Sequence, residues 1–296
     1  MSRIQANLLL LFVAAIWGGG FVSQATAMDE VGPLWFVSLR FGVAALVVLP
    51  FAIWEGARAT KPLSRHSMTG FLFIGLALFG GAATQQWGLL TTTVTNSGFL
   101  TGLYVIFVPI MVVVFMRRRP HWIIWPAAVT AVAGIYLLSG GDLAGLTTGD
   151  LLTVVCALFW GIQVLLVDIH ASGSNRPMAL SVTQFAICAL GGLVLGMILE
   201  PITLKQIIAV LPEVLYSGIL SSGIAFTLQV VAQRYTTAPQ AAIFLASEAL
   251  FAALAGAIML GETISPVGYA GCLMLFTAML AVELVPEWTK AKSMTS

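Results

Sequence analysis

Charged residues are scarce in this chain. Asp, Glu, Lys and Arg together make up 8% of its 296 residues, whereas about a quarter of the residues in a soluble globular protein are charged. This scarcity excludes an ordinary soluble domain. Hydrophobic residues account for 59% of the chain, and the mean hydropathy is +1.00. The net charge of +1 gives no reason to expect nucleic acid as a partner.

Histidine and cysteine are also rare, and their positions exclude several kinds of site. The three histidines are at least 49 residues apart, which does not suggest a metal site: His66, His121 and His170. The three cysteines fall inside apolar segments and are expected to be small core residues: Cys156, Cys188 and Cys272. No Gly-rich phosphate loop follows a strand, and no nucleophile or acid pair is backed by a base. We therefore predict no catalytic residue, no metal and no cofactor, and a protein that is not an enzyme.

Long apolar segments are abundant instead. A bilayer core about 30 Å thick needs roughly 20 apolar residues in a helix. Ten windows meet this requirement: residues 5–27, 32–54, 69–90, 95–116, 121–139, 148–168, 177–199, 210–232, 238–260 and 265–285. The connections are too short for a soluble domain, so we predict an all-α polytopic membrane protein with ten transmembrane helices. The residues after Trp288 are expected to form a short, polar, disordered tail.

The first window has an alternative interpretation. Arg3, the apolar stretch after it and the segment Ala25-Thr26-Ala27 also fit a secretory signal peptide with an A-x-A cleavage site. We favour a transmembrane helix, because the stretch is longer than a usual signal core and its counterpart in the second half lies in mid-chain.

Basic residues gather at alternate connections, and this sets the expected orientation. Cytoplasmic loops near span ends are enriched in Lys and Arg. If the N-terminus is cytoplasmic, nearly all basic residues fall on that side: Arg3, Arg58, Lys61, Arg65, Arg117, Arg118, Arg119, Arg176, Arg234, Lys290 and Lys292. The opposite connections carry acidic residues: Asp29, Glu30, Asp142, Asp150, Glu200, Glu213 and Glu262. Both termini are therefore predicted to be cytoplasmic.

The chain also repeats a pattern at an interval of 143 residues. Trp17-Gly18 recurs as Trp160-Gly161. Further residues have an identical partner at this interval: Gly75, Gly80, Thr84, Gln86 and Thr93. Each copy holds five spans, and since five is odd, the second copy must cross the membrane in the opposite direction. Inverted repeats are typical of transporters, whose substrate site lies near the midplane. We predict one five-helix repeat at residues 1–140, an inverted one at 148–286, and a cytoplasmic tail at 287–296.

Aromatic and uncharged polar residues form stripes on six of the predicted helices. A polar side chain is costly against lipid, so these stripes are expected to face protein, water or substrate. Their members are predicted to line a cavity: Trp17, Gln24, Gln85, Gln86, Ser97, Thr101, Tyr104, Trp160, Gln163, Ser222, Gln229, Phe244 and Ser247. Two alternatives stay open. Ser and Thr often bond a carbonyl of their own helix, and Trp17 and Trp160 could instead pack tightly beside Gly18 and Gly161.

Arg40 and Glu248 are ionisable residues deep inside predicted spans. Charge within the membrane is costly and is by default a functional hypothesis. Glu248 lies about 10 residues from either end of its span, hence near the midplane, and completes the predicted cavity. It could couple to protons, bind a substrate amine or pair with Arg40. For Arg40 a structural role is favoured.

These motifs resemble the drug/metabolite transporter superfamily, EamA type, over the whole chain. The resemblance rests on the Trp-Gly pair of each half and on Phe99-Leu100-Thr101-Gly102-Leu103-Tyr104 leading to Pro109. Glu248, followed 13 residues later by Gly261-Glu262, matches the pattern that this family has in its second half. Two departures occur: Ala249 replaces the usual proline after Glu248, and Arg118-Arg119 replaces the Gly-Glu pair of the first half. In architecture and length the chain is similar to YddG-type amino-acid exporters.

The resemblance implies a bacterial inner-membrane carrier that exports small organic metabolites by alternating access. Aromatic, amide and carboxylate side chains suit a neutral or zwitterionic amino acid, and drug-like compounds are the next alternative. Phosphorylated substrates rank below both, because Arg40 is the single basic residue well inside the predicted spans. A non-transport scaffold or receptor is the competing class, and a channel is disfavoured because no ring of charges is present. The expected partners are the small-molecule substrate and the lipid bilayer, and the oligomeric state stays open.

Overall fold

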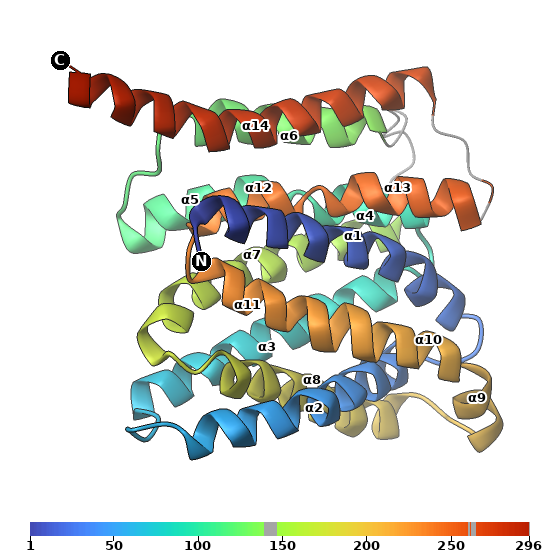
Figure 1. Ribbon diagram of the computed structural model, residues 1–296. Coiled ribbons are helices and arrows are strands. Elements are labelled where there is room, and N and C mark those ends of the chain that lie inside the picture. The colour runs from blue at the N-terminus through green and yellow to red at the C-terminus, as the bar shows by residue number, and fades with distance from the viewer. Residues whose placement is uncertain (139–146, 260, 262–264, 296) are drawn as a thin grey trace.

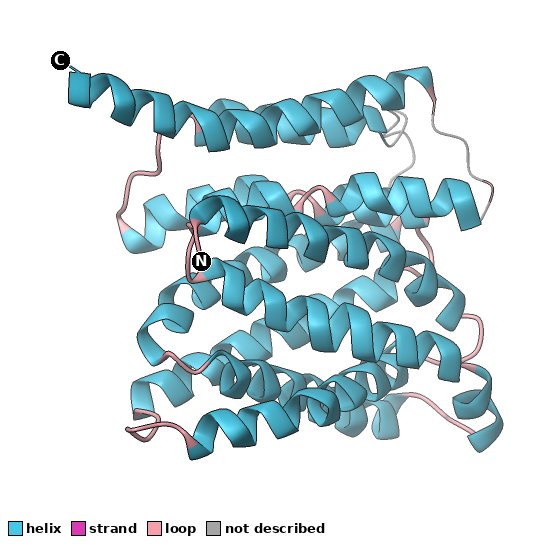
Figure 2. Ribbon diagram, viewed as in Figure 1, coloured by secondary structure: helices cyan, strands magenta, loops and turns pink. Residues whose placement is uncertain are grey.

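The computed structural model describes residues 1–138, 147–259, 261 and 265–295, and helices are the regular elements of these ranges (Figures 1 and 2). The first half forms α1 (Arg3–Ala27), α2 (Pro33–Ala57), α3 (Arg65–Gly88), α4 (Val94–Thr101), α5 (Tyr104–Met116) and α6 (Ile124–Leu138). The second half forms α7 (Thr148–Ser174), α8 (Pro177–Leu199), α9 (Leu204–Ala209), α10 (Leu211–Leu215), the π-helix η1 (Tyr216–Phe226), α11 (Thr227–Gln233), α12 (Ala238–Leu245), α13 (Glu248–Met259) and α14 (Pro266–Thr295). Asp142 and Glu262, two of the predicted acidic loop residues, lie outside the described ranges.

The predicted windows coincide with the helical segments. Nine segments of the described chain are long and apolar enough to cross a membrane, and a tenth, Ile124–Leu137, is apolar but shorter. The prediction of an all-α membrane protein with ten spans is therefore confirmed. Two details differ: α9 was not predicted, and α14 continues to Thr295 where the sequence suggested a disordered tail. Residues 287–295 contain neither Pro nor Gly, so no helix-breaking residue ends α14 after Pro286.

Helices of the two repeats pair with each other rather than forming separate lobes. α2 lies along α8, α3 along α7, and α6 along α14 (Figure 1). α1 packs in the interior against α13 and η1. The N- and C-termini lie on the same side of the bundle, which we call the termini side (Figure 1). The interior of the fold therefore lies at the boundary between the repeats.

The fourth and ninth spans are each broken near their midpoint. α4 ends at Thr101 and α5 begins at Tyr104, while α12 ends at Leu245 and α13 begins at Glu248. Across both breaks the backbone forms bonds of the i to i−3 type, which tighten the turn. The breaks occupy equivalent places in the two repeats, and each places a cavity-facing residue at the start of a half-helix.

The two breaks differ in their local chemistry. In the first repeat Pro109 lies inside α5 and has no N–H to donate to the carbonyl of Val105, one turn earlier. In the second repeat α13, the half-helix that follows the break, contains no proline. There the hydroxyl of Ser247 donates to the carbonyl of Phe244 at 2.6 Å, a side-chain bond that competes with regular helix bonding. The proline expected from the resemblance is thus not required for the second break.

Two carboxylates join α2 and α8 at opposite sides of the bundle. Glu200, just after α8, accepts from the backbone N–H groups of Leu34 (3.1 Å) and Trp35 (3.3 Å) in the first turn of α2. Glu55, near the end of α2, accepts from those of Met178 (3.1 Å) and Ala179 (3.0 Å) in the first turn of α8. Each carboxylate thus satisfies N–H groups at the positive end of the partner helix.

Candidate functional site

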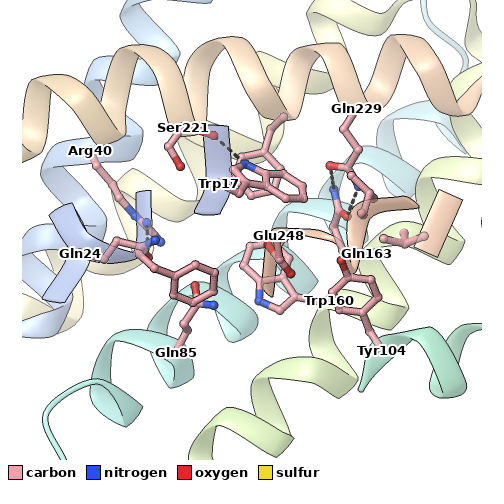
Figure 3. Close-up of a pocket in the computed structure, with 14 residues that line it drawn as sticks. Trp17, Gln24, Arg40, Gln85, Tyr104, Trp160, Gln163, Ser221, Gln229 and Glu248 are labelled. Carbon is pink, nitrogen blue, oxygen red and sulfur yellow. Dashed lines mark hydrogen bonds between the residues drawn. The ribbon is translucent and has the colours of Figure 1, made fainter. Parts of the chain in front are cut away.

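A cavity lies in the interior of the bundle, between the two repeats (Figure 3). Its lining residues come from spans of both halves: Trp17, Phe21, Gln24, Arg40, Gln85, Tyr104, Trp160, Gln163, Val164, Ser221, Phe226, Gln229, Leu245 and Glu248. The free space is about 30 Å³, room for about two water molecules. A larger solute can therefore enter only if the lining side chains move apart.

Aromatic rings form the central wall of this cavity. Trp160 stacks on Phe226 with ring centroids 5.4 Å apart and an interplanar angle of 16°. Trp17 lies 4.6 Å from Phe226 and 6.4 Å from Trp160. The indole N–H of Trp17 donates to the carbonyl of Ser221 at 2.9 Å, inside η1. This bond joins the first helix of one repeat to the π-helix of the other.

Amide side chains close the cavity on the termini side. The Nε2 of Gln229 donates to the Oε1 of Gln163 at 3.0 Å, and the Nε2 of Gln163 donates to the Oε1 of Gln184 at 3.2 Å. Figure 3 shows Gln163 and Gln229 together at one end, with Arg40, Gln24 and Gln85 at the other. Gln85 is held by the hydroxyl of Thr101, to which its Nε2 donates at 3.2 Å.

Arg40 and Glu248 face the cavity but do not pair with each other. Arg40 is 3% exposed, and its Nη1 donates to the Oε1 of Gln24 at 2.7 Å. Glu248 is 4% exposed, and its Oε1 has no hydrogen-bond partner in the described part of the chain. The hydroxyl of Tyr104, on the same wall, lies beside this carboxylate. The alternative of an Arg40–Glu248 ion pair is therefore wrong for this conformation, and the two side chains line one cavity as separate groups.

The structure brings many of the sequence-predicted residues to this cavity. Those that line it are Trp17, Gln24, Arg40, Gln85, Tyr104, Trp160, Gln163, Gln229 and Glu248. The glycine next to the first tryptophan also packs closely: a Cβ on Gly18 would meet the backbone of α13. Cavity lining and tight helix packing thus occur together here, on neighbouring residues.

Six predicted residues are buried but do not line the cavity: Gln86, Ser97, Thr101, Ser222, Phe244 and Ser247. Gln86 points toward α1, where its Nε2 donates to the carbonyl of Gln24 at 3.4 Å. Thr101 lies behind Gln85 as its acceptor. Phe244 and Ser247 belong to the helix break, where Leu245 lines the cavity instead. For Ser97, nothing in its contacts explains the position beyond its burial.

The π-helix explains why Ser221 lines the cavity and Ser222 does not. The prediction assumed a regular helical period, which aligns Ser222 with Gln229. Bonds of the i to i+5 type in η1 make each turn about one residue longer. On the helix face that carries Gln229, the position two turns earlier is therefore Ser221 rather than Ser222. Sequence periodicity also missed the apolar members Val164, Phe226 and Leu245, since apolar residues are common on every face of these helices.

Comparisons with known proteins agree with this architecture. The sequence profile described as the EamA-like transporter family matches residues 4–140 and 147–284. An uncharacterized transporter of Archaeoglobus fulgidus is 30% identical, over 96% of this chain and 87% of its own. The threonine/homoserine exporter RhtA of Escherichia coli is 26% identical, over 96% and 92%. The uncharacterized inner membrane transporter YicL of Salmonella typhimurium is 22% identical, over 96% of each chain.

A solved crystal structure shares the fold. It superposes with a TM-score of 0.77 at 16% identity and covers 96% of this chain and 98% of its own. The two profile matches fall on the two halves in which the sequence repeats and in which the helices are inverted. The chain belongs to the EamA-like transporter family of the drug/metabolite transporter superfamily, and it is a multi-pass transporter of the inner membrane.

Proposed function

We propose that this protein exports neutral amino acids from the cytoplasm by alternating access. One observation carries the proposal: a cavity between the inverted repeats combines stacked aromatic rings with a buried carboxylate, Glu248, whose Oε1 is unpartnered. The rings offer contacts to an apolar side chain, and the carboxylate offers an acceptor to an ammonium group. The relative RhtA is named as a threonine/homoserine exporter, which supports amino acids as the substrate class.

Export of drug-like cations is the second candidate. Aromatic faces and a carboxylate also attract organic cations, through cation–π and ionic interactions. This candidate predicts transport of amines that lack a carboxyl group, whereas the first predicts transport of zwitterions. A broad substrate panel separates the two.

The direction of transport depends on the orientation in the membrane. Connections rich in Lys and Arg share the termini side of the bundle with both termini (Figure 1), and such loops face the cytoplasm. We propose that the termini are cytoplasmic. The amide end of the cavity, with Gln163 and Gln229, then faces the cytoplasm, and the Arg40 end faces outward.

The broken spans suggest how the cavity opens. Each break lies beside the cavity and ends a half-helix that contacts the opposite repeat. Broken helices at the midplane are typical of carriers in which one repeat rocks against the other. The small free volume fits a closed conformation that must open to admit a solute. We propose that the segments 101–104 and 245–248 change conformation during this movement.

Counterflow in proteoliposomes tests the function. The purified protein is reconstituted, the lumen is loaded with an unlabelled amino acid, and uptake of the labelled one is followed. We expect faster, saturable uptake with trans-stimulation, which a channel does not give. Trp160→Ala in the cavity should reduce exchange, and Trp125→Ala, 41% exposed on α6, should not. Absence of exchange across amino acids, amines and other metabolites would favour a scaffold and overturn the proposal.

A further inference from the structure

We infer that the outward end of the cavity is a carboxylate site, in which Arg40 binds the α-carboxylate of the substrate and points its ammonium group toward Glu248. The inference rests on the proposed function and narrows it, because it makes a free carboxylate a requirement for binding. Five features of this end of the cavity support it, and a series of ligand analogues tests it.

The first feature is an uncompensated charge. Arg40 is 3% exposed in the interior of a membrane protein, and no carboxylate among the described residues forms an ion pair with it. Burying a charge without a partner is strongly unfavourable, and proteins keep such groups where they pair or act. Its nearest polar partner is the neutral side-chain oxygen of Gln24. A bound anion would supply the missing charge.

The second feature is the unused hydrogen-bonding capacity of the guanidinium. The group has five N–H donors in a rigid plane. One of them, on Nη1, is occupied by Gln24 at 2.7 Å, whereas Nε has no hydrogen-bond partner. A planar guanidinium matches a carboxylate with two parallel bonds. Arg40 also lines the cavity, so a carboxylate inside it meets this side chain.

The third feature is that neighbouring side chains hold the guanidinium in place. Its central carbon lies 4.8 Å from the ring centroid of Phe41 and 5.5 Å from that of Phe36, both on α2. The bond to Gln24 ties it to α1. Aromatic faces attract a cation without neutralising it. Arg40 is thus oriented before any ligand binds, which lowers the entropy lost on binding.

The fourth feature is the placement of the opposite charge. Arg40 is 7 residues from the start of α2, and Glu248 is 11 residues from the end of α13. Arg40 and Glu248 therefore approach the cavity from two different helices, well inside their spans. A zwitterion that enters the cavity is offered a cationic partner for its carboxylate and an acceptor for its ammonium group. Figure 3 shows Arg40 at one end and Glu248 beside the tryptophans.

The fifth feature is the polar surrounding of the same end. Gln24 and Gln85 line the cavity there and can donate to carboxylate oxygens. The opposite end has no basic side chain among its lining residues in the described chain. A carboxylate therefore has one preferred end, and the substrate has one preferred orientation. An organic cation, in contrast, would meet repulsion from Arg40.

Binding of ligand analogues to the purified full-length protein tests this assignment, with isothermal calorimetry as the readout. Threonine, homoserine and phenylalanine identify an amino acid that binds. Its carboxamide, which keeps the ammonium and loses the carboxylate charge, should bind about 10- to 100-fold more weakly. This comparison needs no variant, so a folding defect cannot obscure it. Equal binding of acid and amide would overturn the carboxylate site and leave the proposed function intact.

Variants assign the effect to Arg40. Arg40→Gln should weaken binding of the amino acid about 10- to 100-fold and leave binding of its amide unchanged. Arg40→Lys should bind the amino acid with an affinity between those of the unaltered protein and Arg40→Gln. Arg65→Gln, on an exposed arginine at the start of α3, is the matched control and should change neither. An equal loss for acid and amide in Arg40→Gln would indicate a structural role and refute the assignment. If no amino acid binds while organic cations do, the proposed function fails together with this inference.

Discussion

Replacement of Glu200 by glutamine tests whether α2 and α8 are joined as one unit. The carboxylate of Glu200 accepts from the N–H of Leu34 with both oxygens, at 3.2 and 3.1 Å, and from that of Trp35 at 3.3 Å. Glutamine keeps one acceptor oxygen and loses the charge. The change therefore removes the electrostatic part of the contact with little change in shape.

The expected loss follows from the geometry. Hydrogen bonds to a charged group contribute about 1.5–3 kcal/mol and neutral ones about 0.5–1.5 kcal/mol. A negative charge at a helix N-terminus adds about 0.3–1 kcal/mol. Because Glu200 is partly exposed, values near the lower ends apply, and we expect a loss of about 1–2 kcal/mol in the free energy of unfolding. Such a loss lowers Tm by about 2–5 °C for a protein of this size.

Thermal unfolding of the protein in detergent provides the measurement. Glu55→Gln, at the equivalent contact on the termini side, should give a similar decrease, since Glu55 accepts from two N–H groups and pairs with Arg176 at 3.3 Å. Glu30→Gln, on an exposed residue after α1, is the control for loss of charge alone. We expect the KM for exchange to stay unchanged in Glu200→Gln, because this residue is remote from the cavity. A Tm equal to that of Glu30→Gln would refute the argument.

Three further changes have defined outcomes. Glu248→Gln should abolish any pH dependence of exchange if this carboxylate couples transport to protons, and counterflow at several pH values measures it; an unchanged pH profile excludes Glu248 as the coupling site. Trp17→Phe keeps most of the ring and loses the bond to the carbonyl of Ser221, so we expect about 1–2 kcal/mol lower stability, which an unaltered Tm would contradict. Gly192→Ala should cost about 1–3 kcal/mol, because its Cβ would lie 2.8 Å from backbone atoms of Leu34 and Ser38, whereas Gly173→Ala, with open space around it, should be near neutral.

Much of the fold could be predicted from the sequence because the membrane imposes one requirement on every span. Each helix needs about 20 apolar residues, and that requirement locates the ten spans without knowledge of their packing. The breaks at 101–104 and 245–248 could not be located in this way. They involve local bonding, such as that of the Ser247 hydroxyl, which leaves the hydropathy of the span unchanged.

The cavity was predicted where polarity and depth coincide, and missed where the helix departs from its regular period. Glu248 and Gln163 are polar residues at mid-span. Because such residues are costly in lipid, the sequence alone identified them as candidate cavity residues. Ser221 and Ser222 are equally polar neighbours, and the choice between them depends on η1, whose longer turns have no signature in composition. The sequence also could not distinguish Gln85, which lines the cavity, from Gln86, which does not, because the helices around α3 bury both side chains.

Part of the cavity wall follows the symmetry of the repeats. Trp17 and Trp160 occupy equivalent positions at the interval of 143 residues, as do Phe21 and Val164, and all four line the cavity. An exchange of conformations between the repeats would therefore leave this part of the wall similar in the inward- and outward-open states. Such a wall can hold the same side chain throughout a transport cycle.

The charges do not follow this symmetry. The position equivalent to Arg40 is Thr183, and the position equivalent to Glu248 is Val105. When the repeats exchange conformations, the two charges keep their order along the membrane normal, because each belongs to one repeat only. A zwitterion would then keep one orientation in both states, while a substrate without a carboxylate would have no preferred orientation. Reversal of the order, in an Arg40→Thr, Thr183→Arg double variant, should therefore weaken binding of the amino acid about 10- to 100-fold, and unchanged binding would show that the position of the basic residue is unimportant.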